Sequence, residues 1–362
     1  MCEPMDLRGF IDVLSREGCL LRIDRQVDWK CELGELTRSH RVPLLFENIK
    51  DYPGHRVFTN GLISFSSLAL ALGLASDLSR RGILSEARKR VAGPITPLML
   101  ESGPVLENII PASEIDFLKF PVPQWRVKDG GRYIGTWHIN VTRDPETGSR
   151  NLGVYRMQVV GPGQTTVSTF PKSHLSLQMA KAERAGRPLE MAVAIGASEP
   201  VVMAASAGYP CGQDEYELAG ALQGEPIRLV KCSTVDLEVP ADSEIAVEGI
   251  IRPGVRVKDG PYFDYAGVAT TNQKAFLFEA TRLMYRNNPV FRGSAIGQPA
   301  AEDQVLLSVL SGLNLFDFHG SRAKRFVQAQ LLKGRFFRMF QFAGRIGPAM
   351  FRRRSKERSG SE

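Results

Sequence analysis

Short runs of β-forming residues, separated by Gly, Pro and Asp turns, dominate the middle of this chain of 362 residues. Many short strands with such turns between them favour a sheet-rich barrel or sandwich. The runs occupy residues 133–142, 152–160, 190–196, 227–232, 244–252, 263–270 and 276–285, and helical patterns occupy 174–185 and 214–222. We therefore predict an α/β (α+β) protein whose central domain, residues 105–300, is rich in β-sheet.

Residues 1–104 show a different pattern, in which helices and strands alternate. Leu7, Phe10 and Leu14 recur at helical spacing up to Gly18, which predicts a helix over 7–17. Strands are predicted at 20–23, 44–48 and 56–59, and the apolar run 62–75 is predicted to be a buried helix. The first 104 residues are therefore expected to form an N-terminal α/β region.

The apolar run 62–75 also bears on membrane insertion, because a spanning helix needs about 20 apolar residues. It is shorter than that and contains Ser64, Ser66 and Ser67, so we predict no transmembrane segment. The N-terminal sequence MCEPMDLRGF lacks the basic-then-apolar pattern of a signal peptide. The cysteines are scattered and form no CxxC pair, which is typical of a reduced, cytoplasmic protein without a structural zinc site.

Positive charge is concentrated at the C-terminal end. Residues 322–362 hold 12 Lys and Arg against Glu357 and Glu362, whereas the whole chain has a net charge of +7. Because the charge belongs to this segment and not to the central domain, we expect no nucleic-acid partner. Apolar residues at near-helical spacing predict a basic amphipathic helix, which either packs on the chain's own core or lies on a membrane surface or in a partner's groove.

Charged residues in the β-rich region are candidates for chemistry. Arg156 lies in an apolar run, and a buried arginine needs a carboxylate or phosphate partner because an unpaired buried charge costs several kcal/mol. Asp259 and Asp264 flank a Gly-Pro pair that marks a loop. Two such acids can converge so that one donates a proton while an arginine keeps the other ionised. The alternatives are a structural ion pair for Arg156 and solvated turn acids for the aspartates.

Other signals are weaker when taken singly. Asn151 follows a turn sequence and fits a hairpin, and His174 fits the start of a helix. No GxGxxG, Walker, GxSxG or HExxH sequence occurs, which excludes the dinucleotide fingerprint, the P-loop and two common hydrolase motifs. The residues alone therefore indicate a candidate Arg–carboxylate site and name neither a substrate nor a cofactor.

Ordered sequence blocks extend over about residues 5–312. They are LRGFI at 7–11, LFEN at 45–48, PVPQW at 121–125, DGGRYI at 129–134, TRDPETG at 142–148, RNLGVYRMQ at 150–158, DEYELAG at 214–220, GEP at 224–226, LVKC at 229–232, VPADSEI at 239–245 and YRNN at 285–288. In this order they resemble the UbiD-type decarboxylases, which use prenylated FMN.

The resemblance implies an N-terminal α/β region, a central FMN-binding split β-barrel and a C-terminal domain. Here we expect that last domain to be truncated to a helical tail over residues 301–362. The family reaction is the reversible, non-oxidative decarboxylation of aromatic or α,β-unsaturated acids. The prenylated flavin takes up the electrons, and the protein supplies orientation and a proton.

The resemblance also implies roles for individual residues. Arg156, Asp259 and Asp264 match the catalytic arginine and two acids, of which Asp264 would be the proton donor. Asn151 and His174 match metal-site residues that hold an Mn2+-like ion against the flavin phosphate. The remaining flavin contacts would be Val154, Tyr155, Ala205, Ser206 and Ala207, with a K+ site beside the last three. Strand alternation would put Asn151 and Arg156 on opposite faces, so either Asn151 precedes the strand or a bulge intervenes.

The chain departs from the family pattern in three places. Arg228 stands where we expect the third metal ligand, a glutamate, so we predict a weakened metal site with Arg228 bound directly to the flavin phosphate. Asp259 and Asp264 replace glutamates, which shortens each side chain by about 1.5 Å. The sequence after about residue 312 matches no family motif, so the usual active-site cover is expected to be absent.

Two hypotheses follow. The first is an active decarboxylase of a small aromatic or unsaturated acid, supplied with cofactor by a flavin prenyltransferase and assembled as a homo- or hetero-oligomer. The second is a degenerate homologue that serves as a structural or regulatory subunit beside a full-length relative. Arg228 and the unmatched C-terminal region motivate the second.

Overall fold

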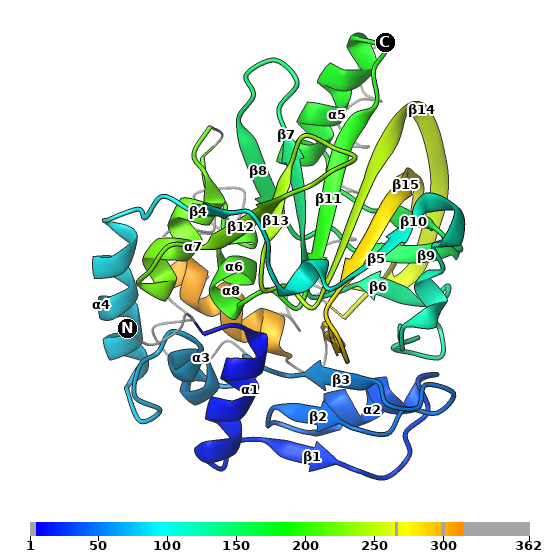
Figure 1. Ribbon diagram of the computed structural model, residues 1–362. Coiled ribbons are helices and arrows are strands. Elements are labelled where there is room, and N and C mark those ends of the chain that lie inside the picture. The colour runs from blue at the N-terminus through cyan, green and yellow to red at the C-terminus, as the bar shows by residue number, and fades with distance from the viewer. Residues whose placement is uncertain (1–4, 211, 265–266, 298–300, 314–362) are drawn as a thin grey trace, which may run out of the picture.

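A computed structural model describes residues 5–210, 212–264, 267–297 and 301–313 of the chain. The basic amphipathic tail expected from the sequence lies outside these residues. In Figure 1 a small sheet with its helices lies below a larger, strongly curved sheet, and α8 lies between the two. This mixed α/β architecture with a curled half-barrel confirms the predicted fold class.

The N-terminal region forms the small sheet, in the order β1-β2-β3-β16. Its elements are α1 (Leu7–Arg16), β1 (Leu21–Ile23), α2 (Glu32–Ser39), β2 (Leu44–Phe46), β3 (Arg56–Thr59), α3 (Phe65–Ala71) and α4 (Arg80–Val91). Its last strand, β16 (Val290–Arg292), comes from the far end of the central region and pairs parallel to β3. The small sheet is therefore completed by residues outside the range 1–104.

Helix α1 begins and ends close to where its sequence predicts. The carboxylate of Asp6 accepts a hydrogen bond of 2.8 Å from the Gly9 N–H and so caps the helix. Leu7, Phe10 and Leu14 are all buried, as their spacing requires. The predicted helix over 62–75 is shorter than expected, because α3 starts only after a capping box between Ser64 and Ser67.

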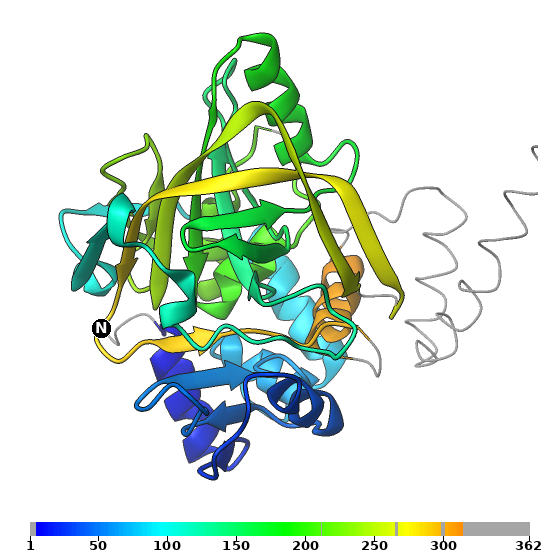
Figure 2. The same cartoon turned by 90° about the vertical axis from the view of Figure 1, so that its right-hand side faces the viewer.

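The central region forms the larger sheet, in the order β6-β9-β10-β15-β14-β11-β7-β8, with β5 paired to β15. Its strands are β5 (Asn108–Pro111), β6 (Tyr133–Gly135), β7 (His138–Arg143), β8 (Arg150–Gly153), β9 (Met157–Gly161), β10 (Gln164–Val167), β11 (Leu189–Ile195), β14 (Ile245–Phe263) and β15 (Ala269–Tyr285). Figure 2 shows β14 and β15 curving together around the half-barrel. Register shifts along this pair supply the curvature.

Strand β11 separates two hydrophobic cores. Ala192 and Ala194 pack into the core that includes helix α6, whereas Met191, Val193 and Ile195 pack into the core inside the half-barrel. Alternate side chains of a strand point to opposite faces, and here both faces are covered. This explains why the strand is an almost continuous apolar run in the sequence.

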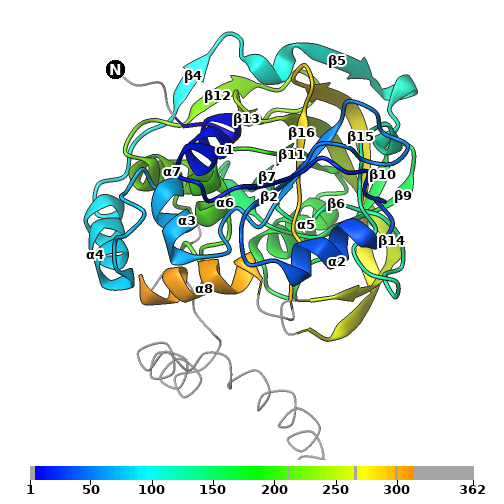
Figure 3. The same ribbon diagram turned by 90° about the horizontal axis from the view of Figure 1, so that it is seen from below.

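A third, small sheet has the order β13-β12-β4. Its strands are β4 (Leu98–Leu100), β12 (Arg228–Lys231) and β13 (Glu238–Pro240), and the remaining helices are α5 (His174–Arg184), α6 (Glu199–Ala205), α7 (Glu215–Gln223) and α8 (Glu302–Gly312). Helix α8 ends beside α4, where Arg88 Nη2 donates to the Gly312 carbonyl at 2.6 Å (Figure 3). Among the described residues, no helix has both the length and the apolar character needed to cross a membrane.

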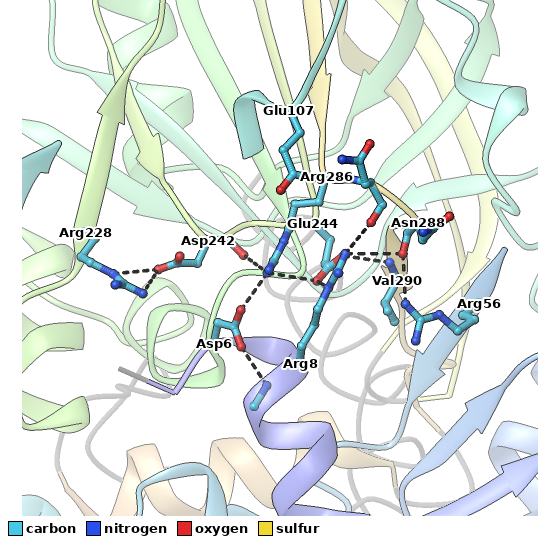
Figure 4. Close-up of polar contacts among 12 residues, drawn as sticks. Asp6, Arg8, Arg56, Glu107, Arg228, Asp242, Glu244, Arg286, Asn288 and Val290 are labelled. Carbon is cyan, nitrogen blue, oxygen red and sulfur yellow. Dashed lines mark hydrogen bonds and ion pairs between the residues drawn. The ribbon is translucent and has the colours of Figure 1, made fainter. Parts of the chain in front are cut away.

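A cluster of charged groups around Glu244 joins α1 to the larger sheet (Figure 4). The buried Glu244 carboxylate accepts hydrogen bonds from Arg8 at 2.7 and 2.8 Å and from the Val290 N–H at 2.9 Å. Arg286 lies 3.4 Å from the same carboxylate and donates to Asp6 at 2.7 Å. This Glu244 cluster therefore ties together the start of α1, the end of β15 and the start of β16.

Candidate active site

Arg156 and Asp259 form a buried ion pair at the concave sheet. Arg156 Nε and Nη2 lie 2.7 and 2.5 Å from Asp259 Oδ1, and Arg156 Nη1 donates to Thr270 Oγ1 at 2.9 Å. The other Asp259 oxygen accepts from Thr166 Oγ1 at 2.6 Å. The structure therefore joins two of the three residues that the sequence suggested as catalytic.

This pair leaves part of the arginine available. A guanidinium has five N–H donors, and the contacts to Asp259 and Thr270 account for three of them in the described part of the chain. The Arg156 side chain is 15% exposed and that of Asp259 is fully buried. The remaining donors, at the Nη1 and Nη2 end, have the fork geometry that binds a carboxylate bidentately.

The backbone between Asn151 and Arg156 is not one continuous strand. Asn151 lies within β8, and the irregular segment 154–156 separates β8 from β9. Within it, the Tyr155 N–H donates to Asn140 Oδ1 at 3.0 Å, and the Tyr155 carbonyl lies 3.1 Å from His138 Nε2. The expectation that Asn151 precedes its strand is therefore wrong. Instead, the irregular segment after Gly153 interrupts the alternation of side chains between the two faces of the sheet.

Asn151 and His174 lie side by side, as the resemblance implied. His174 is the first residue of α5, and its Nδ1 lies 2.8 Å from Asn151 Oδ1. Burial lowers the pKa of His174, which favours the neutral ring. Because Nδ1 faces an acceptor it carries the proton, and the lone pair of Nε2 is then available to a metal ion.

Glu215 is an acidic residue of this group that the sequence analysis did not single out. It is the first residue of α7, and its Oε2 accepts a hydrogen bond of 3.0 Å from the N–H of Leu152, the residue after Asn151. Burial raises the pKa of Glu215 to about 7. The signal in the sequence is an acid directly before the largely buried helical segment 216–222, within the block DEYELAG.

Arg228 has a different environment from the one expected. Its Nε and Nη2 bind Asp242 Oδ2 at 3.1 and 2.9 Å (Figure 4). It lines a cavity of about 20 Å³ together with Asp6 and Ser198, which is large enough for a water molecule but not for a flavin. No hydrogen bond or ion pair joins Arg228 to Asn151 or His174 in the described structure. This geometry does not support the assignment of Arg228 to the metal position or to the flavin phosphate.

The other residues expected at the flavin lie around β8. Ala205 ends α6, a helix packed against β7 and β8, and the Ser206 hydroxyl donates to the Val202 carbonyl at 2.8 Å. Val154 and Ala207 are partly buried against the same core. Burial raises the pKa of Tyr155, so its phenol stays protonated. These residues are thus close to the strand that carries Asn151.

Asp264 follows the last residue of β14 and starts a tight turn. Its N–H donates to the Val268 carbonyl at 3.1 Å, and its Oδ1 accepts from the Val268 N–H at 3.3 Å. The Tyr262 ring, two residues earlier, lies with its centroid 5.1 Å from Arg156 Cζ. Residues two apart on a strand share a face, so Asp264 is expected on the Arg156 side of the sheet.

Metal-binding clusters of three His, Cys, Asp or Glu side chains are absent from the described residues. Asn151 and His174, together with Glu215 on the neighbouring Leu152 N–H, instead offer an amide oxygen, an imidazole nitrogen and a carboxylate oxygen. Such a set suits a divalent ion of the Mn2+ type. Its chemistry is therefore compatible with the ion expected from the resemblance.

Comparisons with known protein families and with individual relatives agree with one another. Residues 11–87 match the N-terminal domain, and residues 98–299 the Rift-related domain, of the family described as 3-octaprenyl-4-hydroxybenzoate carboxy-lyase, UbiD. Pyrrole-2-carboxylic acid decarboxylase of Pseudomonas aeruginosa is 33% identical over 329 residues, which cover 87% of this chain and 66% of the relative. Phenolic acid decarboxylase of Bacillus subtilis is 31% identical over 324 residues, which cover 86% and 68%.

Solved structures give the same result. An evolved dimeric form of the UbiD-class enzyme HmfF from Pelotomaculum thermopropionicum, in complex with prFMN, superposes with a TM-score of 0.78 at 35% identity, covering 85% of this chain and 71% of that one. Vanillic acid decarboxylase of Sedimentibacter hydroxybenzoicus, in its closed form, gives 0.82 at 31% identity, covering 86% and 68%. The chain spans about two thirds of the length of the curated relatives it matches.

Proposed function

The chain belongs to the UbiD family, as its sequence blocks predicted, and from this premise we propose that it catalyses the reversible, non-oxidative decarboxylation of an aromatic or α,β-unsaturated carboxylic acid. The buried Arg156–Asp259 pair is the observation that carries the proposal. It presents a fixed guanidinium fork of the kind that binds a carboxylate. Relatives named for the decarboxylation of pyrrole-2-carboxylic acid and phenolic acids support an aromatic substrate.

We propose prenylated FMN as the cofactor. Asn151, His174 and Glu215 offer a mixed donor set that would hold a divalent ion such as Mn2+ at the phosphate end of the flavin, where the ion would offset negative charge. Val154, Tyr155 and the segment 205–207 fit the flavin itself, with K+ beside Ala205, Ser206 and Ala207. When bound, the prenylated flavin would supply an electron sink for the pair left behind by the departing CO2.

The chain's own residues would orient the substrate and move the proton. Arg156 binds the substrate carboxylate through its free N–H groups, and Asp259 and Thr270 hold the guanidinium in one orientation. Asp264 donates the proton to the carbon that loses CO2. The shorter aspartate is a competent acid for this step, provided that the turn after β14 brings it within about 3 Å of that carbon.

The proposal also covers the source of the cofactor, the oligomeric assembly and the cellular compartment. A flavin prenyltransferase would provide the cofactor, and the chain would act within a homo- or hetero-oligomer. The free thiols of Cys19, Cys31 and Cys232 support a reducing compartment, which we propose to be the cytoplasm.

The alternative, a degenerate subunit beside a full-length relative, loses one of its two motives. That motive was an arginine at the third metal position, yet the Leu152 N–H binds Glu215 whereas Arg228 binds Asp242. The alternative predicts that the chain has no decarboxylase activity of its own. Assays of wild type and of Asp264 variants therefore distinguish an active decarboxylase from a degenerate subunit.

The test compares Asp264→Asn with wild type and with Asp264→Glu, all produced together with a flavin prenyltransferase. Product is measured by chromatography over a panel of aromatic and cinnamic-type acids. Loss of the proton donor should lower kcat by about 10²- to 10⁴-fold in the asparagine variant at equal flavin occupancy, whereas glutamate should retain activity. Undiminished turnover by Asp264→Asn would remove Asp264 from this role, and an inactive wild type with bound flavin would favour the degenerate subunit.

A further inference from the structure

The segment 154–156 lies where a regular strand would continue but does not. Strand β7 pairs with β8 up to Asn140, which lies opposite Gly153. Two further residues in this register would place Tyr155 opposite His138, yet β8 ends at Gly153. The backbone N–H and carbonyl groups of Tyr155 therefore lie outside the ladder and need other partners, because backbone groups withheld from water are costly when they are unpaired.

Two side chains of β7 supply those partners. Asn140 Oδ1 accepts a hydrogen bond of 3.0 Å from the Tyr155 N–H, and His138 Nε2 lies 3.1 Å from the Tyr155 carbonyl oxygen. A carbonyl oxygen only accepts, so Nε2 of His138 carries a proton. Residues two apart on a strand share a face, and this spacing lets one strand hold both backbone groups of Tyr155. We call His138 and Asn140 together the Tyr155 clamp.

Both residues of the Tyr155 clamp are fully buried. Their partners across β11 are Ile195 and Val193, which belong to the apolar core inside the half-barrel. Burial lowers the pKa of His138 to about 4, so the ring is neutral at pH 7. A polar side chain among apolar residues is favourable only where it forms hydrogen bonds, and both side chains are directed at the Tyr155 backbone.

Two glycines make room for this arrangement. A Cβ on Gly135 would lie 2.6 Å from His138 Cε1 and 2.7 Å from its Nε2. A Cβ on Gly153 would lie 2.4 Å from the ring of Tyr155. The imidazole therefore lies directly on the backbone of Gly135, which leaves it no space on that side to move away from the Tyr155 carbonyl.

The residue held by the Tyr155 clamp joins two parts of the candidate active site. Tyr155 immediately precedes Arg156, whose guanidinium is bound by Asp259 at 2.7 Å. The Tyr155 hydroxyl accepts a hydrogen bond of 3.5 Å from the N–H of Leu175, the residue after His174. The clamp thus fixes the backbone at the start of the Arg156 side chain, and Asp259 fixes its end. Such fixing matters because a displacement of about 1 Å can lower the rate of a reaction by about 100-fold.

We propose that His138 and Asn140 are positioning residues, which hold the Tyr155 backbone so that Arg156 presents its remaining N–H groups to the carboxylate of the substrate. The inference rests on the proposed function for the role of Arg156 and extends it to two buried residues that act through Arg156. The clamp itself is a property of the backbone, so its existence is tested without a ligand.

Hydrogen–deuterium exchange of the full chain tests the clamp, because exchange reports local opening. Asn140→Ala removes the acceptor of the Tyr155 N–H, and exchange of the peptide with residues 153–157 should become about tenfold faster or more. His138→Ala should also accelerate it, whereas His138→Gln should restore the wild-type rate, since a glutamine amide can donate from near the position of Nε2. Gly135→Ala, which displaces the imidazole but keeps both side chains, should resemble His138→Ala.

Asn60→Gly is the matched control for the exchange experiment. Asn60 is likewise a buried asparagine that binds backbone, since its Nδ2 donates to the Thr37 carbonyl at 2.8 Å. Its φ of 60° suits glycine, so the variant loses the side chain without backbone strain. It should leave the exchange of residues 153–157 unchanged.

Ligand affinity tests the connection to Arg156. The flavin-loaded full chain is titrated by calorimetry with two pairs, benzoate against benzamide and 3-phenylpropanoate against 3-phenylpropanamide, whose members differ in the charge that Arg156 would bind. Wild type should prefer the acid of at least one pair by about tenfold or more, as hydrogen bonds to charged groups are the stronger ones. His138→Ala should lose most of this preference with the affinity for the amide unchanged, and His138→Gln should retain it. Asp236→Ala, at an exposed carboxylate bound to Lys231, is the surface control and should keep the wild-type preference.

The outcomes separate the clamp from the proposed function. Unchanged exchange at residues 153–157 in both alanine variants would overturn the clamp, whatever the affinities are. Faster exchange with an unchanged preference for the acid, or an equal loss of affinity for acid and amide, would overturn the positioning role and indicate a structural one. A wild type that binds acid and amide equally in both pairs would overturn the role of Arg156 in the proposed function, and with it the positioning role.

Discussion

At the residue scale, the Asp259 carboxylate is a group whose partners are costly to remove. It is fully buried, and its hydrogen bonds come from Arg156 and Thr166. Removing one partner of a buried pair is costly because the other charge stays in the interior without compensation. Removing Arg156 and Asp259 together avoids the cost of an uncompensated buried charge. Stability measurements can therefore reveal the pair without any substrate.

We predict that Arg156→Ala lowers the free energy of unfolding by about 3–5 kcal/mol at pH 7, measured by urea denaturation. The double variant Arg156→Ala/Asp259→Ala should lose clearly less than the sum of the two single variants. Arg22→Ala, which breaks an exposed pair with Glu47, is the control and should change stability by less than about 1 kcal/mol. Additive single effects would mean that the two residues are not coupled.

Sequence reasoning reached part of the site at this scale. A buried arginine needs a carboxylate, and this requirement suggested an Arg–carboxylate site. Only the family resemblance singled out Asp259, the partner of Arg156 that the structure contains. Glu215 escaped notice because an acid in the first turn of a helix is ordinary charge placement. Only the packing of α7 against β8 distinguishes it from a solvated acid.

At the scale of elements, the sequence predicted which segments are strands better than it predicted where they end. The run 244–252 was expected to stop before Pro253 and Gly254, yet β14 continues to Phe263 with a register shift between Ile251 and Arg256. A bulge accommodates Pro and Gly where a regular strand would not. The pairing of the strands could not be predicted from the sequence either. Strand β12 joins β13 and β4 in a separate sheet, and Arg228 on β12 therefore lies away from Asn151 on β8.

The Glu244 cluster gives a prediction for one element. Arg8 binds Glu244 from α1, so Arg8→Ala removes two charge-assisted hydrogen bonds between the helix and the larger sheet (Figure 4). Such bonds contribute about 1.5–3 kcal/mol each when they involve charged groups. We expect faster amide hydrogen exchange in α1 and β16 and unchanged exchange in β11.

Arg25→Ala serves as the control for that experiment, because Arg25 forms an exposed pair with Glu32 in the same N-terminal region. It should leave the exchange of α1 unchanged. Uniformly faster exchange across the larger sheet in Arg8→Ala would instead mean that the cluster stabilises the whole fold and not the attachment of α1.

At the scale of the whole molecule, the strand β16 makes the N-terminal and central regions interdependent. The chain leaves the small sheet after β3, builds the larger sheet, and returns to the small sheet at Val290. The sequence showed a change of pattern near residue 104 but could not show this return, because a strand of three residues carries almost no periodic signal. The two regions thus share a sheet and are not independent structural units.

The central claim is that this fold holds a prenylated flavin beside Arg156 and Asp259. Native mass spectrometry and absorbance of the chain, purified from cells that also produce a flavin prenyltransferase, test it directly. We predict one prenylated FMN per chain in wild type and clearly lower occupancy in His174→Ala, with Asp236→Ala loaded as wild type. A colourless chain without that mass, from cells in which a full-length relative loads normally, would contradict the account.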